Sequence, residues 1–237
     1  ITSSEIVALT TNGKTKDSFG APFNTYVDEC IMERFFKHKL ENEVDVKAFD
    51  WGKLCEIIVH DKLPNNYIMQ SEITYQHPTI SEWCGTPDGR VDINGKCDTI
   101  TDIKCPLTRK GFYNLVKFLY DFDGLIVSKK ENIDGNEIIQ LIRKQSKEGE
   151  KYYWQLVSNS IILNAKYAEL IVFIPYVEEL QEIKDYNRTL DFPYWFVENA
   201  KDGQLPYIYK ESGIESINII RFEVPQEDKD FLTSRVL

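Results

Sequence analysis

The chain has 237 residues, of which 42% are hydrophobic and 28% charged, a balance typical of globular proteins in solution. No apolar run approaches the ~20 residues of a membrane-spanning helix, and the first residues do not resemble a signal peptide. The formal net charge of −10 argues against nonspecific binding to nucleic acid. We therefore expect no membrane partner and a cytoplasmic location, in the host cytoplasm if the protein is viral.

The charges are unevenly distributed along the chain. Residues 103–170 contain 11 Lys and Arg against 8 Asp and Glu, a net charge of +3. The flanking residues 1–102 and 171–237 carry −7 and −6. A basic middle on an acidic body is compatible with a DNA-facing surface, although an excess this small also arises by chance.

The first half of the chain predicts two helices and three strands. Residues 23–40 follow a helical period, with Asn24 or Thr25 as the expected cap and with Tyr26, Cys30, Ile31, Arg34 and Phe35 along one face. A second helix is expected over 50–63, capped by Asp50, with Leu54, Cys55, Ile58 and Val59 as its apolar stripe. The period then changes to about two, which predicts strands at 66–76, 85–93 and 96–105. Asn94-Gly95 predicts a hairpin turn between the last two strands.

The second half predicts further helices and a buried strand. Helices are expected at 107–120, near 136–145 and at 151–165, and residues 168–176 form an apolar strand that ends near Pro175. Residues 216–224 predict another strand, and 191–200 a short helix. The aromatic residues of that short helix, Phe192, Tyr194, Trp195 and Phe196, suit either a subunit interface or core packing. The order predicts an α/β (α+β) fold, a mixed central sheet flanked by helices, in one domain spanning 1–237.

The stretch GTPDGRVDINGKCDTITDIKCP, residues 85–106, gathers polar residues on two neighbouring strands. Asp102 and Lys104 are two apart on one strand, so they share a face, and Asp88 reaches it from the adjoining strand. The backbone carbonyl of Ile103 is free to act as a ligand if the strand end is open. Carboxylates that hold Mg²⁺, with a cation near the attacking water, are what phosphodiester hydrolysis needs. A solvated hairpin with surface charges is the other interpretation of the same stretch.

Two residues of the preceding predicted helix favour the metal site. Gly52 and Glu56 lie four apart on one helix face. The glycine permits close approach of another element, and Glu56 offers a third carboxylate. Taken alone, however, a glutamate at this position is more often an exposed helix carboxylate.

The sequence resembles the phage lambda-type (YqaJ-type) exonucleases of the PD-(D/E)XK nuclease superfamily. The matching pieces occur in the family's order: ITSSE at 1–5, Gly13-Lys14, Thr25-Tyr26, WGKLCE at 51–56, TPDG at 86–89, DIKCPLT at 102–108, Tyr152 and Gln155, and AELIVFIPY at 168–176. The resemblance covers about residues 1–180. It implies a restriction-endonuclease-like core and a single nuclease domain.

The resemblance also implies a role for individual residues. Asp88, Asp102, the carbonyl of Ile103 and Glu56 correspond to the metal ligands, and Lys104 to the residue that activates water. The residues implied in binding DNA and its terminal 5′-phosphate are Ser4, Thr86, Arg109, Lys110 and Gln155. The family usually has Glu at the position of Asp102, and its phosphate-binding arginine is expected upstream of Ile1.

The resemblance implies an Mg²⁺-dependent exonuclease that degrades linear double-stranded DNA from its ends in the 5′→3′ direction. Mn²⁺ is expected to substitute for Mg²⁺. The implied partners are DNA ends, a single-strand annealing protein of phage-type recombination, and further copies of the chain in a homotrimer. An endonuclease with the same core and an inactive DNA-end-binding protein are the alternatives.

The cysteine pattern predicts reduced thiols and no metal cluster. The five cysteines, Cys30, Cys55, Cys84, Cys97 and Cys105, show no paired or zinc-type spacing, which favours a reducing compartment. Nuclease relatives with an iron–sulfur cluster need cysteines near the C-terminus, and none follows Cys105. We therefore expect no iron–sulfur cluster.

Overall fold

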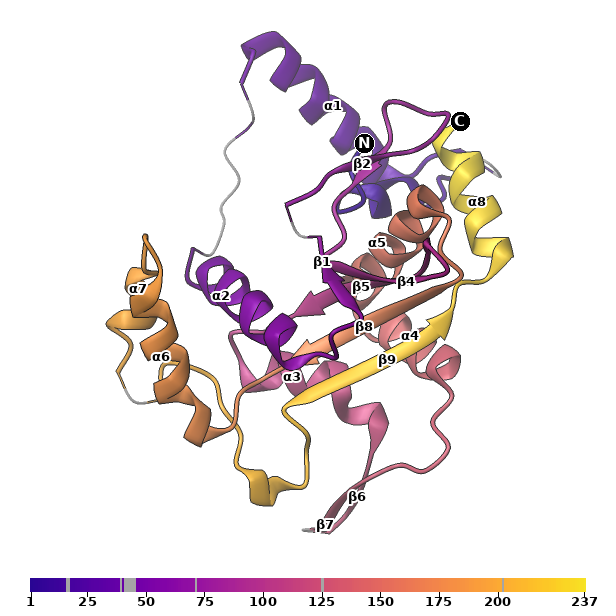
Figure 1. Ribbon diagram of the computed structural model, residues 1–237. Helices are drawn as coiled ribbons and strands as arrows, with labels where there is room; N and C mark the ends of the chain where they lie inside the picture. Colours follow the sequence, from indigo (N-terminus) through magenta and orange to yellow (C-terminus); the bar gives the residue numbers. More distant parts are fainter. Residues whose placement is uncertain (16–17, 39, 41–45, 71, 125, 202) are drawn as a thin grey trace.

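The core of the chain is a five-stranded mixed sheet with helices on both faces (Figure 1). The computed structural model describes residues 1–15, 18–38, 40, 46–70, 72–124, 126–201 and 203–237. The strand order is β1 (Tyr67–Met69), β4 (Gly89–Ile93), β5 (Lys96–Lys104), β8 (Tyr167–Phe173) and β9 (Ile217–Glu223). Strands β5 and β8 are parallel, and the other neighbours are antiparallel. The predicted mixed sheet flanked by helices is confirmed.

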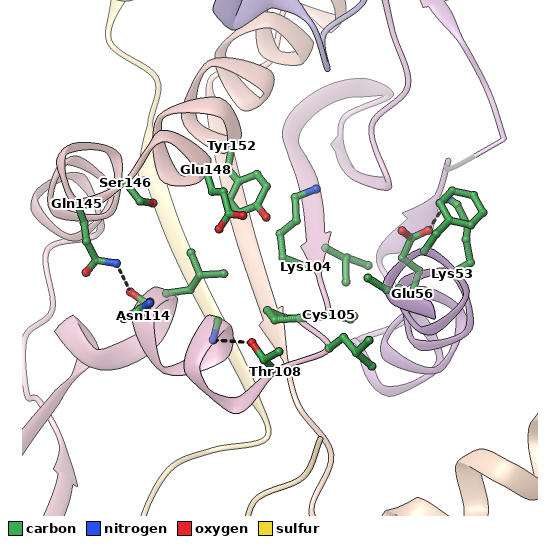
Figure 2. A pocket seen from close by; sticks show the side chains of 18 residues that line it. Lys53, Glu56, Lys104, Cys105, Thr108, Asn114, Gln145, Ser146, Glu148 and Tyr152 are labelled. Carbon is green, nitrogen blue, oxygen red and sulfur yellow. Dashed lines mark hydrogen bonds and ion pairs between the residues drawn. The ribbon is translucent and has the colours of Figure 1, made fainter. Parts of the chain in front are cut away.

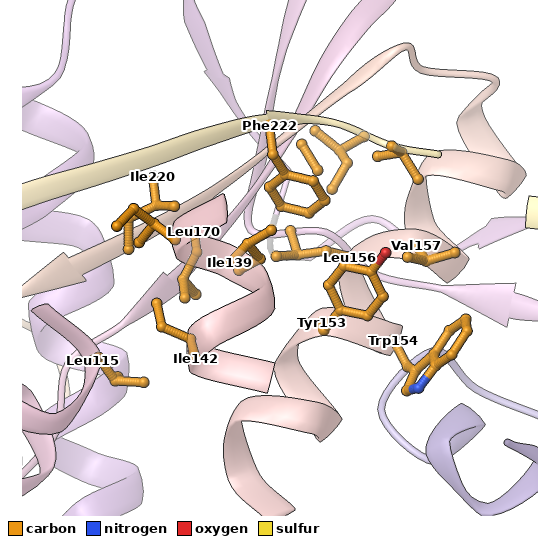
Figure 3. Close-up of a cluster of buried hydrophobic side chains, with 14 of the residues drawn as sticks. Leu115, Ile139, Ile142, Tyr153, Trp154, Leu156, Val157, Leu170, Ile220 and Phe222 are labelled. Carbon is orange, nitrogen blue, oxygen red and sulfur yellow. The ribbon is translucent and has the colours of Figure 1, made fainter. Parts of the chain in front are cut away.

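Alternating side chains of the central strands build a hydrophobic cluster on each face of the sheet. On one face, Ile100, Leu170 and Val172 pack with α4 (Gly135–Gln145) and α5 (Lys147–Leu163), as Figure 3 shows for part of this cluster. On the other face, Ile103, Ile171 and Phe173 pack with α2 (Val46–Lys62). Side chains at even positions of β5 therefore point toward α5, and those at odd positions point toward α2.

The first two helices begin earlier than the sequence predicts. Helix α1 (Ala21–Phe36) has Gly20 as its N-cap and a proline in its first turn, so Asn24 and Thr25 lie inside the helix. Asp50 likewise lies inside α2 and does not cap it. Proline is well suited to a first helical turn because its φ is already fixed near the helical value.

The apolar face predicted for α1 is exposed in the chain, and α1 has no buried residue. Phe35 is 81% exposed, and Ile31 and Phe36 are more than half exposed. The aromatic cluster at 192–196 is divided. Phe192 and Trp195 are exposed, whereas Tyr194 and Phe196 pack against the cluster under α2.

The strand predicted at 66–76 is divided by a turn. Its first part is β1, and its last part is β2 (Tyr75–Gln76), which pairs with β3 (Cys84–Gly85) in a separate two-stranded sheet. The turn forms because the amide of Ile73 donates to the carbonyl of Gln70 (2.8 Å). The hairpin β4–β5 is confirmed, with Asn94 and Gly95 at positive φ as its turn requires.

The remaining elements surround this core. They are η1 (Ile6–Leu9), α3 (Arg109–Val116), η2 (Lys117–Leu119), β6 (Tyr120–Asp123), β7 (Ile126–Lys129), η3 (Val177–Glu179), α6 (Leu180–Thr189), α7 (Trp195–Glu198), η4 (Lys210–Ser212) and α8 (Gln226–Val236). The sequence did not predict the β6–β7 hairpin, α6 or α8. Among the described residues, no helix combines the length and apolarity needed to cross a membrane.

Candidate active site

The candidate site lies where β4 and β5 part. The pairing of these strands begins with Gly89 opposite Thr101, and β5 continues beyond that pair to Lys104. The last residues of β5 therefore have β8 on one side and lack β4 on the other. Asp88 directly precedes β4 and lies at this edge.

Asp88 is bound to the exposed edge of β5. The amide of Ile103 donates to Asp88 Oδ2 (2.7 Å). The amide and carbonyl of one strand residue point to the same side, so the Ile103 carbonyl also points toward Asp88. The Asp88 backbone is fixed as well, because its amide donates to Thr101 (3.1 Å) and its carbonyl accepts from Gln70 (2.9 Å).

Asp102 is fully buried and has two partners from different elements. Lys104 Nζ lies 2.7 Å from Asp102 Oδ2, and Gln155 Nε2 of α5 donates to Asp102 Oδ1 (2.9 Å). Burial raises the pKa of Asp102 to about 7; Lys104 lowers it, but the charges of Asp88 and Glu56 raise it further. Asp102 is therefore a carboxylate that is costly to ionise in the present arrangement.

Lys104 is a cation held between carboxylates and an aromatic ring. Its Nζ lies 5.0 Å from the centre of the Tyr152 ring of α5. Burial alone would lower the pKa of Lys104, but the charges of Asp102 and Asp88 outweigh that effect and raise it. Lys104 therefore stays protonated at neutral pH.

Glu56 reaches the same edge from α2, on the opposite face of the sheet from α5. Burial and the charge of Asp88 raise the pKa of Glu56, while Lys53 opposes that rise. Lys53 Nζ forms an ion pair with Glu56 Oε2 at 2.9 Å. Lys53 was not among the predicted site residues, although its position three residues before Glu56 on a helix is a signal for such a pair.

The three carboxylates are compatible with a divalent cation, but they are not assembled around one. Among the described residues, no three His, Cys, Asp or Glu side chains lie together as a metal-binding group. Asp88, Asp102 and Glu56 instead bind an amide, a lysine with a glutamine, and a lysine respectively. Oxygen ligands suit Mg²⁺, and the mutual repulsion seen in the raised pKa of Asp102 and of Glu56 is what a cation would relieve.

A groove of about 510 Å³ opens beside these residues. Figure 2 shows Lys53 and Glu56 on one wall, Tyr152 and Glu148 on the other, and Lys104 between them. Thr108, the N-cap of α3, and Ser146, the N-cap of α5, also line it. Gly52 lines it as well. The predicted close approach of another element to Gly52 is wrong, because a Cβ atom there would meet nothing within 4 Å.

A second cavity, of about 220 Å³, lies next to Gln155 and is named here the hydroxyl recess. Its lining residues are Thr2, Ser3, Ser4, Thr74, Cys84, Gly85, Thr86 and Gln155. The hydroxyl of Ser4 pairs with that of Thr2 (2.9 Å), and the hydroxyl of Thr86 with that of Thr74 (2.9 Å). The recess thus brings together Ser4, Thr86 and Gln155, and Gln155 connects it to Asp102.

Arg109 and Lys110 are the first two residues of α3 and are exposed. The Arg109 guanidinium lies 4.7 Å from the centre of the Tyr207 ring. The flanking residues Thr108 and Gly111 line the groove. These two basic residues therefore lie at the groove's edge, apart from the carboxylates.

The raised pKa of Asp102 predicts that metal affinity depends on pH. Below about pH 7 the carboxyl is protonated, so a metal ion must displace the proton. We expect Mn²⁺ to bind about tenfold more weakly at pH 6 than at pH 8. Titration calorimetry at the two pH values measures the ratio. Equal affinity at both would mean that Asp102 is ionised throughout.

Solved structures of exonucleases share this fold. No protein-family model matches the chain, and no curated protein matches it in sequence. An alkaline exonuclease (LHK-Exo) from Laribacter hongkongensis is 15% identical with a TM-score of 0.57, covering 100% of this chain and 83% of that one. A phage-related exonuclease from Haemophilus somnus 129PT is 13% identical with a TM-score of 0.58, covering 100% and 89%. The predicted restriction-endonuclease-like fold is confirmed.

Proposed function

We propose that the protein is a metal-dependent exonuclease that degrades linear double-stranded DNA from its ends. The observation that carries this proposal is the convergence of three carboxylates and Lys104 at one open strand edge beside a groove. Glu56 comes from α2, Asp88 from the residues just before β4 and Asp102 from β5. Burial and the charge of Asp88 raise the pKa of the other two carboxyls, while Lys53 pairs with Glu56 and Lys104 with Asp102. The likeness of the chain's fold to solved exonuclease structures supports hydrolysis of DNA as the reaction.

In this proposal Asp88, Asp102, Glu56 and the Ile103 carbonyl are the ligands of Mg²⁺, for which Mn²⁺ substitutes. The bound metal supplies Lewis-acid stabilisation of charge and lowers the pKa of water. Lys104 orients the attacking water and offsets negative charge that develops on the phosphate. Tyr152 and Asp102 hold the Lys104 ammonium in place. Gln155 holds the Asp102 carboxylate through Oδ1.

The hydroxyl recess is proposed to bind the terminal 5′-phosphate of the DNA. Ser4 and Thr86 offer hydroxyl donors, and Gln155 connects the recess to Asp102. A DNA end bound there lies at a fixed distance from the carboxylates, which favours 5′→3′ degradation by single nucleotides. Arg109 and Lys110 are proposed to contact backbone phosphates at the edge of the groove.

The wider setting of the proposal is phage-type recombination, with a single-strand annealing protein as partner and a homotrimer as the active assembly. The exposed apolar face of α1 is compatible with an interface of this kind. An endonuclease with the same core and an inactive end-binding protein remain the alternatives. Neither has a feature among the described residues that favours it.

Product analysis tests the proposal. A linear duplex, labelled at one 5′ end in one sample and at one 3′ end in another, is incubated with Mg²⁺, Mn²⁺ or EDTA. We expect the 5′ label to be released at once as a mononucleotide and the 3′ label to remain on long strands until late. No release with either metal contradicts the nuclease. Early internal fragments identify an endonuclease.

Gly52 offers a test of the groove as the substrate path. Gly52→Ala is expected to raise stability by about 0.5–1 kcal/mol, because glycine weakens a helix interior and the new Cβ meets no atom. Gly52→Leu extends a larger side chain into the groove, so we expect cleavage to slow about tenfold or more while thermal stability is kept. Thermal melting and initial rates measure the two effects. Normal cleavage by Gly52→Leu would exclude DNA from this part of the groove.

A further inference from the structure

Asn159 is a buried amide on the helix that carries Gln155. It lies one turn after Gln155 on α5 and is 1% exposed. Neither its Oδ1 nor its Nδ2 has a hydrogen-bond partner among the described residues. A buried polar group without a partner loses the hydrogen bonds that water would give it, so such a group in a folded protein calls for an explanation.

The surroundings of Asn159 place it directly behind the wall of the hydroxyl recess. A Cβ atom on Gly85 would lie 2.1 Å from Asn159 Oδ1 and 2.3 Å from Ser3 Oγ. Gly85, Ser3 and Gln155 all line the recess. Because Gly85 has no Cβ atom, the Asn159 amide packs close to the backbone of a residue that lines the recess.

The neighbouring polar residue on α5 has the partners that Asn159 lacks. Ser158 is also fully buried, and its hydroxyl pairs with Ser3 Oγ (2.8 Å) and accepts from Trp83 Nε1 (2.8 Å). Ser158 thus holds the segment that carries Ser3 and Ser4 against α5. This contact explains how the recess is built, and Asn159 has no part in it.

We propose that Asn159 is a specificity-determining residue that reads the terminal 5′-phosphate of DNA bound in the hydroxyl recess, an inference that rests on the proposed function. Among the described residues neither atom of its amide is paired, so a half-turn of the amide about its last side-chain bond would bring Nδ2 to Gly85 and Ser3 in the recess wall. A terminal phosphate brings three acceptor oxygens to the other side of that wall. A 5′-hydroxyl end is shorter and leaves the buried amide unpaired, which is how polar sites reject a substrate that lacks one group.

The test compares linear duplexes with 5′-phosphate and 5′-hydroxyl ends. We expect the wild-type protein to cleave the phosphorylated duplex faster, and Asn159→Leu to reduce this preference at least tenfold. Leucine has nearly the same shape and suits an apolar site, so its melting temperature is expected to equal or exceed that of the wild type. A residue with only a structural role would not change the ratio between the two DNA ends.

Ser160→Ala is the matched control on the same helix. Ser160 is fully buried, but its hydroxyl donates to the carbonyl of Ala165 and does not line the recess. We expect Ser160→Ala to lower stability slightly and to keep the wild-type preference. If Asn159→Leu does not fold, Asn159→Ser serves instead, because a hydroxyl on a shorter side chain fits the site but does not reach across Gly85.

The outcomes separate this inference from the function on which it rests. An unchanged preference in Asn159→Leu, or a wild-type protein without any preference, overturns the role of Asn159 and leaves the nuclease intact. If the wild-type protein cuts neither duplex with Mg²⁺ or Mn²⁺, the nuclease proposal fails instead. The ratio is then measured as the relative affinity for the two duplexes in Ca²⁺. Equal affinity, or no binding of either duplex, overturns the inference in that case too.

Discussion

Asp102→Asn is expected to slow cleavage of linear DNA about a thousandfold or more while the protein stays folded. Asparagine keeps the shape of the side chain and can still accept the hydrogen bond from Gln155. In the proposed function it removes the charge of a metal ligand, and metal ions supply several kcal/mol of transition-state stabilisation. Mn²⁺ affinity measured by calorimetry is expected to fall together with the rate.

Glu169→Gln is the matched control for this loss. Glu169 is also buried, lies on the neighbouring strand β8 and pairs with Arg221 at 2.9 Å. It has the same type of ion pair as Asp102 but lies on the other face of the sheet and lines no part of the groove described above. We expect Glu169→Gln to lose stability and to keep activity. If Asp102→Asn cleaves DNA at nearly the wild-type rate, Asp102 has no essential role in the reaction.

Lys104→Met is expected to lower the rate about a hundredfold to a thousandfold by a different route. The carboxylate ligands remain, so Mn²⁺ binding at alkaline pH is expected to persist within about tenfold. The lost contribution is the ammonium that orients water, a contribution of the size that positioned proton-transfer groups make. A variant that binds the metal but does not cut identifies Lys104 with the chemical step.

Lys166→Met is the control for Lys104 because the two lysines have the same kinds of partners. Lys166 Nζ lies 3.7 Å from a Glu223 oxygen and 4.8 Å from the centre of the Tyr167 ring. Lys104 has a carboxylate and a tyrosine ring in the same roles. Equal losses in both variants would mean that general electrostatics, and not the position of Lys104, sets the rate.

The β4–β5 hairpin and the shared face of Asp102 and Lys104 were predictable because they follow from short stretches of sequence. Asn94-Gly95 specifies the hairpin, and the period of two then fixes that Asp102 and Lys104 share a face. The approach of Glu56 was not predictable from period alone, since it depends on how α2 packs across β5. The ordered resemblance to known exonucleases supplied that step.

The residues that sequence patterns missed are those whose positions depend on distant parts of the chain. The predicted first strand is divided after Gln70, where the Ile73 amide donates to the Gln70 carbonyl, and its last part pairs with β3 and not with β4. The predicted N-caps of α1 and α2 were wrong. Asn24 and Asp50 are residue types that often cap helices, but here they lie inside longer helices. Asn159 gives no signal in the sequence, since its burial against Gly85 and the lack of a partner for its amide among the described residues show only in the structure.

The fold alone does not decide between an exonuclease, an endonuclease and an inactive end-binding protein. The carboxylates and Lys104 favour a catalytic role, because burying the charges of Asp102 and Lys104 costs free energy that a purely structural site would not need. The hydroxyl recess beside Gln155 is proposed to bind a terminal 5′-phosphate, and this role would give a preference for ends over internal sites. The carboxylates with Lys104 predict cleavage of DNA, and the hydroxyl recess predicts that linear DNA is cleaved but closed circular DNA is not.

The most direct measurement is digestion of one plasmid, either linear with 5′-phosphate ends or closed circular, with Mg²⁺ and with EDTA. The proposed function predicts that only the linear form is lost and only with Mg²⁺, and that Asp102→Asn spares it. Cutting of the closed circle would contradict end recognition and point to an endonuclease. Survival of both forms with Mg²⁺ would contradict the nuclease itself.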